Sequence, residues 1–128
     1  MVKTFRQKQL ARMTPRARVL AERARRLALG FDYDFEDERG VHRIGTTDQD
    51  MKGWDEVSKI AQALINLGMG STPIDIVTDT GPCEVTAMEW QQVLAAAAAF
   101  RQPIWANSFE LQAMGEIPED PSDNEYWS

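Results

Sequence analysis

The sequence predicts an α+β fold in which a basic N-terminal helix is followed by a hairpin–helix–hairpin–helix (ββαββα) domain with one small antiparallel sheet. Three observations predict it: a sharp division of charge near residue 30, two segments that alternate apolar and polar residues around a turn, and two amphipathic segments that each follow a capping box. They divide the chain into a basic helical arm (1–30), an α+β domain (31–114) and an acidic C-terminal tail (115–128).

The division of charge sets residues 1–29 apart from the rest of the chain. This segment carries nine basic residues and one acid, Glu22, for a net charge of +8, although the whole chain has a net charge of −6. The remainder therefore carries −14. Such asymmetry indicates that the first segment has a function of its own.

The main helix of the arm is expected to begin with Thr14 as its N-cap and Pro15 in the first position. It should run to Leu29, with Gly30 as the left-handed cap. Its apolar residues alternate at spacings of three and four, as in a coiled coil, and Pro15 separates them from the turn upstream. The stripe consists of Leu10, Met13, Ala17, Leu20, Ala24, Leu27 and Phe31.

The first half of the α+β domain is expected to be a hairpin and a helix. Residues 31–36 alternate aromatic and acidic side chains, so a strand would place the aromatics on one face and the carboxylates on the other. Arg39-Gly40 supplies the turn, and residues 41–44 alternate again. Thr47 with Asp50 then forms a capping box for a helix that ends near Leu67.

The second half of the domain repeats this order. Residues 73–80 and 83–85 are expected to pair around a turn. Thr86 with Glu89 forms a second capping box, which opens the last helix, and Pro103 should kink that helix. Beyond Gly115 the chain is acidic and contains prolines, so we expect an extended tail that is ordered only where something holds it.

The composition argues against a membrane protein and against disulfide chemistry. No apolar run is long enough to span a bilayer, and the N-terminus lacks the apolar core of a signal peptide, so we expect a protein made and assembled in a cytosol. The single cysteine, Cys83, excludes an internal disulfide and is interpreted as a small, half-buried side chain.

A search for catalytic motifs finds no glycine-rich phosphate loop, no paired cysteines and no nucleophile elbow. His42 could act as a general base, or ligate a metal with Asp32, Asp34 or Glu36. The favoured interpretation is a strand residue that faces solvent or packs against an aromatic side chain. The nearby acids lack the calcium-loop pattern. We therefore expect no enzymatic activity, no cofactor and no metal site.

The basic helix and the aromatic residues outside the core are candidates for partner docking. Trp54 and Trp90 lie in the first turns of amphipathic helices and are expected in the core. Trp127 fits an interface anchor. For Trp105, burial in the core, which is the commoner fate, and an interface role both remain open. The candidate docking residues are Arg16, Arg18, Leu20, Arg23, Arg25, Arg26, Leu27, Trp105, Tyr126 and Trp127. An acidic protein surface, such as that of a neighbouring copy, matches them best.

Two other interpretations of the basic helix remain open. Nine cations could bind a nucleic acid, with a steep dependence on salt, but the remaining −14 charge would repel a polyanion. Alternatively, the helix covers its own domain and has no external partner.

Several motifs of the α+β domain carry a resemblance to a known family. They are Gly-Val-His-Arg-Ile-Gly-Thr-Thr (40–47), Gly-Trp-Asp-Glu-Val (53–57) and Val-Thr-Ala-Met-Glu-Trp (85–90), the last of which leads into an alanine-rich helix. From about Phe31 to Met114 the chain resembles a domain of unknown function found in bacteriophage tail and tail-fibre proteins, of the type carried by phages of alphaproteobacteria. These motifs are turns, caps and core aromatics, and they identify no active site.

The resemblance implies a structural virion protein of the phage tail, at the tail tip, the baseplate or a tail-fibre connector. Its expected partners are other tail proteins and further copies of itself, and closed symmetry suggests a trimer or a hexamer. The alternative is a tail-fibre assembly chaperone that is absent from the mature virion. A nucleic-acid-binding accessory protein is the third and least favoured function.

Overall fold

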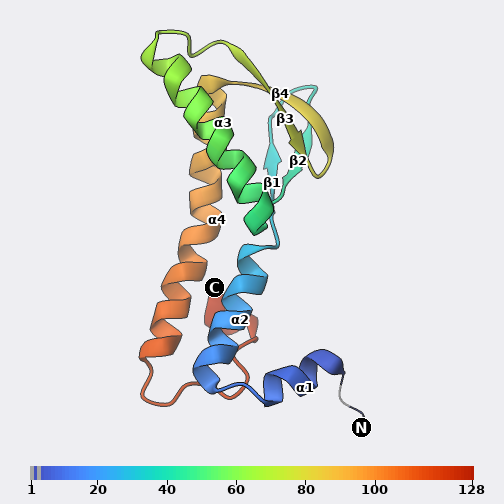
Figure 1. The fold of residues 1–128 in the computed structure, drawn as a ribbon, viewed down its shortest axis with the longest axis vertical. Helices are drawn as coiled ribbons and strands as arrows, with labels where there is room; N and C mark the ends of the chain where they lie inside the picture. Colours follow the sequence, from blue (N-terminus) through green and yellow to red (C-terminus); the bar gives the residue numbers. More distant parts are fainter. Residues whose placement is uncertain (1, 3) are drawn as a thin grey trace. The chain divides into compact units, whose positions relative to one another are not determined.

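The computed structural model describes residues 2 and 4–128 and has the predicted α+β class (Figure 1). Its elements, in chain order, are α1 (Phe5–Ala11), α2 (Pro15–Leu27), β1 (Phe31–Asp34), β2 (Val41–Ile44), α3 (Asp48–Asn66), β3 (Pro73–Thr78), β4 (Gly81–Thr86), α4 (Ala87–Ala113) and the 3₁₀ helix η1 (Asn124–Trp127). The chain forms two compact units. Unit 1 comprises residues 1–26 and 101–128, and unit 2 comprises residues 27–100.

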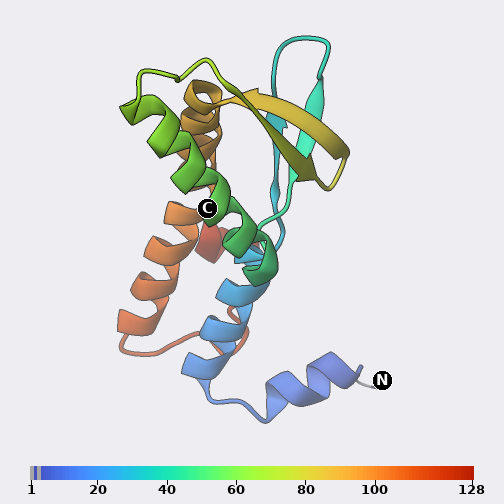
Figure 2. The ribbon, with the colours of Figure 1, turned by 45° about the horizontal axis from the view of Figure 1, so that its top comes forward.

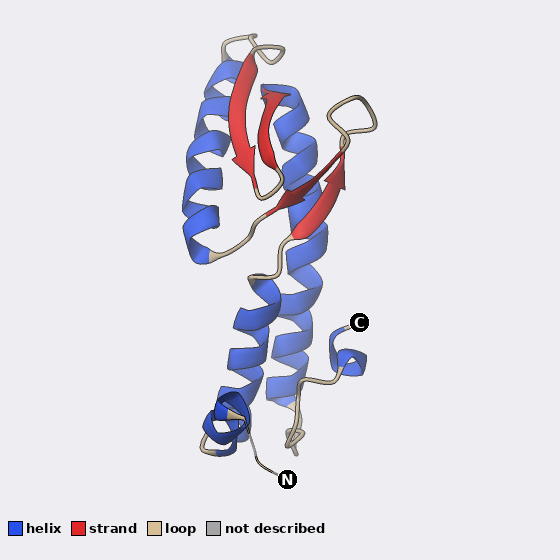
Figure 3. Ribbon diagram, turned by 90° about the vertical axis from the view of Figure 1, so that its right-hand side faces the viewer, coloured by secondary structure: helices blue, strands red, loops and turns tan. Residues whose placement is uncertain are grey.

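This division differs from the expected boundary at residue 114. Residues 101–113 of α4 belong to unit 1, where they run beside α2 in the opposite direction (Figures 1 and 3). The helix itself passes through Pro103 without interruption. No helix in the described part of the chain is long and apolar enough to cross a membrane.

Helix α1 was not expected from the sequence, although a local signal for it exists. Thr4 Oγ1 accepts a hydrogen bond from the backbone N–H of Gln7 at 3.1 Å, and the Gln7 side chain accepts one from the backbone N–H of Thr4 at 2.8 Å. This reciprocal pair is a capping box, which satisfies two donors that would otherwise lack partners at a helix start.

Helix α2 begins as predicted, because Thr14 Oγ1 accepts a hydrogen bond from the N–H of Ala17 at 3.1 Å. It ends two residues before the expected Leu29. The hydroxyl of Thr46 donates to the carbonyl of Leu27 at 2.7 Å and accepts from the N–H of Gly30 at 2.9 Å. Gly30 adopts the expected left-handed conformation, with φ = 76°.

The predicted coiled-coil stripe of α2 is not the face that the structure buries. Val19 and Glu22 are the buried residues of this helix, whereas Leu20 and Leu27 are half-buried and Ala24 is exposed. The reason is that α2 packs within its own unit, against segments more than 80 residues away in the chain, so tertiary contacts select the buried face.

Unit 2 contains two separate two-stranded sheets rather than the single sheet that the sequence predicted (Figure 3). In the first hairpin Phe31 pairs with Ile44, and in the second Ile74 pairs with Val85. The hairpins meet where the N–H of Asp79 donates to the carbonyl of Arg43 at 3.0 Å. This contact lies at the end of β3, so β2 and β3 do not form a continuous ladder.

The core of unit 2 lies between the hairpins and the two helices, and α3 and residues 87–100 of α4 are on the same side of the hairpins (Figure 2). Trp90 is 1% exposed, and its ring centre lies 5.3 Å from that of Trp54. Its Nε1 donates to Ser58 Oγ at 3.0 Å. The sequence-based assignment to the core is confirmed for Trp90, and Trp54 is partly buried against that core.

Arg39 joins the first hairpin to the start of α4. Its guanidinium lies 4.4 Å from the centre of the Phe35 ring, and Nη2 donates to both Asp37 and Glu89 at 2.6 Å. These hydrogen bonds hold the pKa of Asp37 and of Glu89 below their ordinary values. Glu89 also forms the predicted capping box with Thr86.

Candidate docking surface

The two units differ in net charge, although by less than residues 1–29 differ from residues 30–128. Unit 1 contains ten basic and seven acidic residues, which gives +3, because the acidic C-terminal tail belongs to it. Unit 2 contains four basic and thirteen acidic residues, which gives −9. The unit that contains the basic helix thus neutralises much of its own charge.

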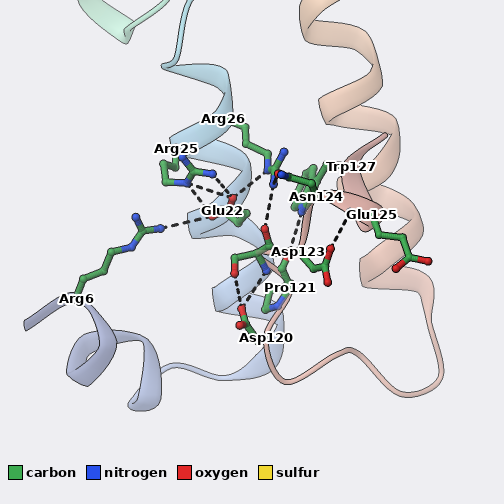
Figure 4. Close-up of polar contacts among 11 residues, drawn as sticks. Arg6, Glu22, Arg25, Arg26, Asp120, Pro121, Asp123, Asn124, Glu125 and Trp127 are labelled. Atoms are coloured by element: carbon green, nitrogen blue, oxygen red, sulfur yellow. Dashed lines mark hydrogen bonds and ion pairs between the residues drawn. The ribbon is translucent and has the colours of Figure 1, made fainter. Parts of the chain in front are cut away.

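Glu22 is the main site of this neutralisation (Figure 4). Its side chain is 3% exposed and accepts hydrogen bonds from Arg25 Nη2 at 2.6 Å, from Arg26 Nε at 2.9 Å and from Arg6 Nη2 at 3.5 Å. The hydrogen bond to Glu22 raises the pKa of Arg25. Three of the cations of the basic segment therefore surround one buried carboxylate, which we call the Glu22 cluster.

The C-terminal segment, residues 115–128, is held against α2 by two arginines. Arg18 Nη1 donates to the carbonyl of Glu119 at 2.6 Å. Arg26 Nη2 donates to the carbonyl of Ser122 at 3.0 Å and to Asn124 Oδ1 at 2.7 Å (Figure 4). The expected tail is thus in contact with its own chain, through arginines that we predicted to dock a partner.

Trp127 lies within the same contact. The sequence suggested an exposed anchor, but its side chain is only 6% exposed, and the guanidinium of Arg26 lies 5.2 Å from the ring centre. Its Nε1 donates to the carbonyl of Pro121 at 2.7 Å. Tyr126 remains accessible, with 36% exposure. Trp127 therefore stabilises unit 1 in this conformation and is not available to a partner.

An open cavity of about 650 Å³ lies between α1, α2 and the C-terminal segment. Leu10 and Pro121 provide apolar surface, and Arg6, Arg18 and Asp120 line it with charges of both signs. Hydrogen bonds from Ser122 lower the pKa of Asp120. The arginine side chains are already bonded within unit 1, so the cavity offers few uncommitted groups.

A second surface of unit 1 combines arginine side chains with aromatic rings, of which Arg16 and Phe109 are exposed and Arg23 and Trp105 are half-buried. The Arg23 guanidinium lies 4.4 Å from the centre of the Trp105 ring, and its Nη1 donates to Ser108 Oγ at 3.2 Å. The ring of Phe109 lies 6.1 Å from that of Trp105 and is 58% exposed.

Arg16 extends this surface, because its Nε donates to Gln112 Oε1 at 3.2 Å. We call the five residues Arg16, Arg23, Trp105, Phe109 and Gln112 the α2–α4 face. Sequence reasoning identified Arg16, Arg23 and Trp105 but missed Phe109 and Gln112. The signal for Phe109 was its position four residues after Trp105, which places both rings on one side of a helix.

His42 and Cys83, the other side chains that the sequence analysis considered for chemistry, are buried in unit 2. His42 is 7% exposed, with Nδ1 2.7 Å from Thr78 Oγ1, and it packs edge-on against Phe35 at 5.6 Å, which confirms the interpretation of a histidine packed on an aromatic. Cys83 is buried, and burial raises the pKa of its thiol. Among residues 2 and 4–128, no group of three or more histidine, cysteine, aspartate or glutamate side chains is placed to hold a metal ion.

Comparisons of the chain with protein-family models, with curated proteins and with solved structures find no match.

Proposed function

We propose that this chain is a structural protein of a bacteriophage tail, at the tip, the baseplate or the base of a fibre, that acts by docking to other proteins rather than by catalysis. The resemblance of residues 31–114 to the tail-protein domain supports the location. The observation that supports docking is the α2–α4 face, where arginine side chains and an exposed phenylalanine form one surface.

The composition of this face fits a protein interface. Tryptophan and arginine are the residues most enriched among those that contribute strongly to binding. Arg23 is already held over Trp105, so little side-chain entropy is lost when a partner binds it. A matching partner would offer carboxylates to Arg16 and Arg23 and an apolar contact to Phe109.

The same contacts argue against nucleic acid as the main partner. Arg18, Arg25 and Arg26 donate hydrogen bonds to oxygen atoms of their own unit, so the cationic surface is smaller than the sequence suggests. Unit 2, with its charge of −9, would repel a polyanion. A nucleic-acid function would require binding that weakens steeply with salt and that is lost without residues 1–29.

Quantitative mass spectrometry of purified phage particles tests the proposal. A small fixed copy number relative to the tail-tube protein is expected for a symmetric tail component. Absence from particles, combined with binding to a fibre subunit in lysate, would instead indicate the assembly chaperone.

A variant of the α2–α4 face tests the docking role in the same particles. Arg16→Glu combined with Phe109→Ser changes two exposed positions and should reduce incorporation at least about tenfold. Lys8→Glu, an exposed position on α1 with the same change of charge, is the matched control. Normal incorporation of the double variant would refute docking through this face.

A further inference from the structure

The turn of the first hairpin is a rigid acidic element of unit 2. The N–H of Phe35 donates to the carbonyl of Gly40 at 3.1 Å, and that of Gly40 donates to the carbonyl of Asp37 at 3.0 Å. Asp34 Oδ1 accepts a hydrogen bond from the N–H of Glu36 at 2.8 Å. Together with the contacts of Arg39, these bonds fix the direction in which the turn presents its carboxylates.

Glu36 is held in an unusual backbone conformation within this turn. Its φ of 61° makes it the one residue other than glycine with a positive φ in the described part of the chain. Such a conformation costs on the order of 1 kcal/mol for a residue with a Cβ. Glycine would adopt this conformation without that cost, so the turn keeps a carboxylate at a position where its backbone is strained.

The carboxylates of the turn are available to an external partner. Glu36 and Glu38 are exposed, and neither is paired with a cation among residues 2 and 4–128, whereas Asp37 is bound to Arg39. Asp34 lies opposite Val41 in the hairpin, and Val41 is 53% exposed. The hairpin end therefore presents carboxylates next to an exposed apolar side chain.

The α2–α4 face offers the complementary chemistry. It presents Arg16 and Arg23 next to Phe109, which is 58% exposed. Carboxylates would meet guanidinium groups, and Val41 would meet an aromatic ring. Each copy of the chain carries one acidic turn and one α2–α4 face. The turn belongs to unit 2, which has a charge of −9, and the face belongs to unit 1, which has a charge of +3.

We infer that the acidic turn of one copy, residues 34–41, docks onto the α2–α4 face of a second copy. This inference rests on the proposed function and names the partner of the same face. Because two different surfaces meet, the contact is head-to-tail, and it produces a ring when the rotation between copies closes. Attraction between the oppositely charged units brings the copies together before the short-range contacts form.

Sedimentation of the purified full chain, with a charge exchange between the two surfaces, tests the contact. At about 50 mM salt the wild-type chain should form a discrete oligomer, and at about 500 mM salt its association constant should fall at least tenfold. Arg16→Glu alone should give a monomer, and so should Glu36→Lys with Glu38→Lys. A chain with all three substitutions should recover association, because the carboxylate introduced at position 16 would meet the amines introduced at positions 36 and 38.

Two further variants separate the contact from effects on folding. Glu36→Gly removes the carboxylate and also the energetic cost of the positive φ. The variant should therefore weaken assembly while keeping or increasing the stability of unit 2. Lys8→Glu should leave assembly unchanged.

The outcomes separate this contact from the proposed function. A monomeric wild-type chain at high concentration and low salt, or failure of the triple substitution to restore assembly, would overturn the contact between copies. If the chain is monomeric and the variant with Arg16→Glu and Phe109→Ser is still excluded from phage particles, the face binds a different tail protein, and only the proposed function stands.

Discussion

Glu22 and Arg25 form a hydrogen bond of 2.6 Å in which the carboxylate is buried and the guanidinium is partly exposed. They lie three positions apart on α2, so the pair forms on a single helix face. Two more arginines bond the same carboxylate. A buried charge of this kind is stable only when all its partners are present.

Replacing Glu22 by alanine should therefore destabilise unit 1. Loss of one partner of a buried ion pair typically costs 3–5 kcal/mol, and the partial exposure of the arginines reduces this to about 2–3 kcal/mol. Urea unfolding followed by hydrogen exchange in α2 measures the effect. Glu110→Ala, an exposed glutamate of the same unit, should change the free energy of unfolding by less than about 0.5 kcal/mol. Equal effects of both substitutions would contradict the structural role of the Glu22 cluster.

Trp127→Ala should release the C-terminal segment from α2. The buried indole is lost together with its stacking on Arg26. We therefore expect the contact between the C-terminal segment and α2 to be destabilised by about 3 kcal/mol, and hydrogen exchange over residues 119–128 to be faster. Limited proteolysis provides a second measurement. Tyr126→Ala changes a more exposed neighbour and should leave the segment protected. Slow hydrogen exchange in the Trp127 variant would show that the hydrogen bonds from the arginines to the backbone carbonyls hold the segment without the indole.

Unit 2 should lose stability in acid through the partners of Arg39. The pKa of Glu89 is lower in the folded chain than its ordinary value of 4.5, chiefly because Arg39 donates hydrogen bonds to it. The stabilisation is therefore complete above about pH 4.5 and is lost as the pH falls through the folded-state pKa. Urea unfolding between pH 7 and pH 3, followed in unit 2, should show this loss. Arg39→Gln should flatten the profile, and an unchanged profile would assign the acid sensitivity to other carboxylates.

Ser58→Ala should destabilise the core of unit 2 by about 1–2 kcal/mol. The hydroxyl of Ser58 accepts the hydrogen bond of the Trp90 indole, which is almost completely buried, so the substitution leaves a buried N–H without its partner. Thermal unfolding of the variant and of Ser71→Ala, an exposed control, gives the comparison. Identical melting temperatures would mean that the indole N–H finds another acceptor.

Two glycines should respond to alanine in opposite directions. At Gly30 the backbone is left-handed, and an added Cβ would lie 2.6 Å from the carbonyl oxygen of Ile44, so Gly30→Ala should cost at least about 1 kcal/mol. At Gly53, within α3, a Cβ meets nothing within 4 Å, so Gly53→Ala should add about 0.5–1 kcal/mol through helix propensity. Calorimetry of both variants measures whether each substitution raises or lowers the stability of the fold. A stabilising Gly30→Ala would contradict the left-handed cap.

The elements that the sequence predicted correctly are those with local signals. Thr14 at the start of α2, the box of Thr47 and Asp50, and the box of Thr86 and Glu89 all act within three residues. The alternation that defines the first hairpin is equally local, and the half-burial of its aromatic residues confirms it. The same kind of local signal, the capping box of Thr4 and Gln7, lies at the start of α1.

The candidate site was predictable only in part. Arginine and tryptophan enrichment identified the region, and Arg16, Arg23 and Trp105 do lie on one accessible face. Arg18 and Arg26 instead bind the C-terminal segment. Composition alone cannot distinguish a cation that awaits a partner from one that has a partner in its own chain, because both look the same in the sequence.

Local sequence signals specify the two hairpins, the helices α2, α3 and α4, their order and most of their ends, because caps, turns and alternation depend on neighbours a few residues away. Packing between distant segments sets which face of α2 is buried, how many sheets form and which arginines remain accessible. The contact of Arg18 with Glu119 joins residues 101 positions apart. Such contacts depend on how helices and strands pack against one another once they have formed, and no local sequence pattern specifies that packing.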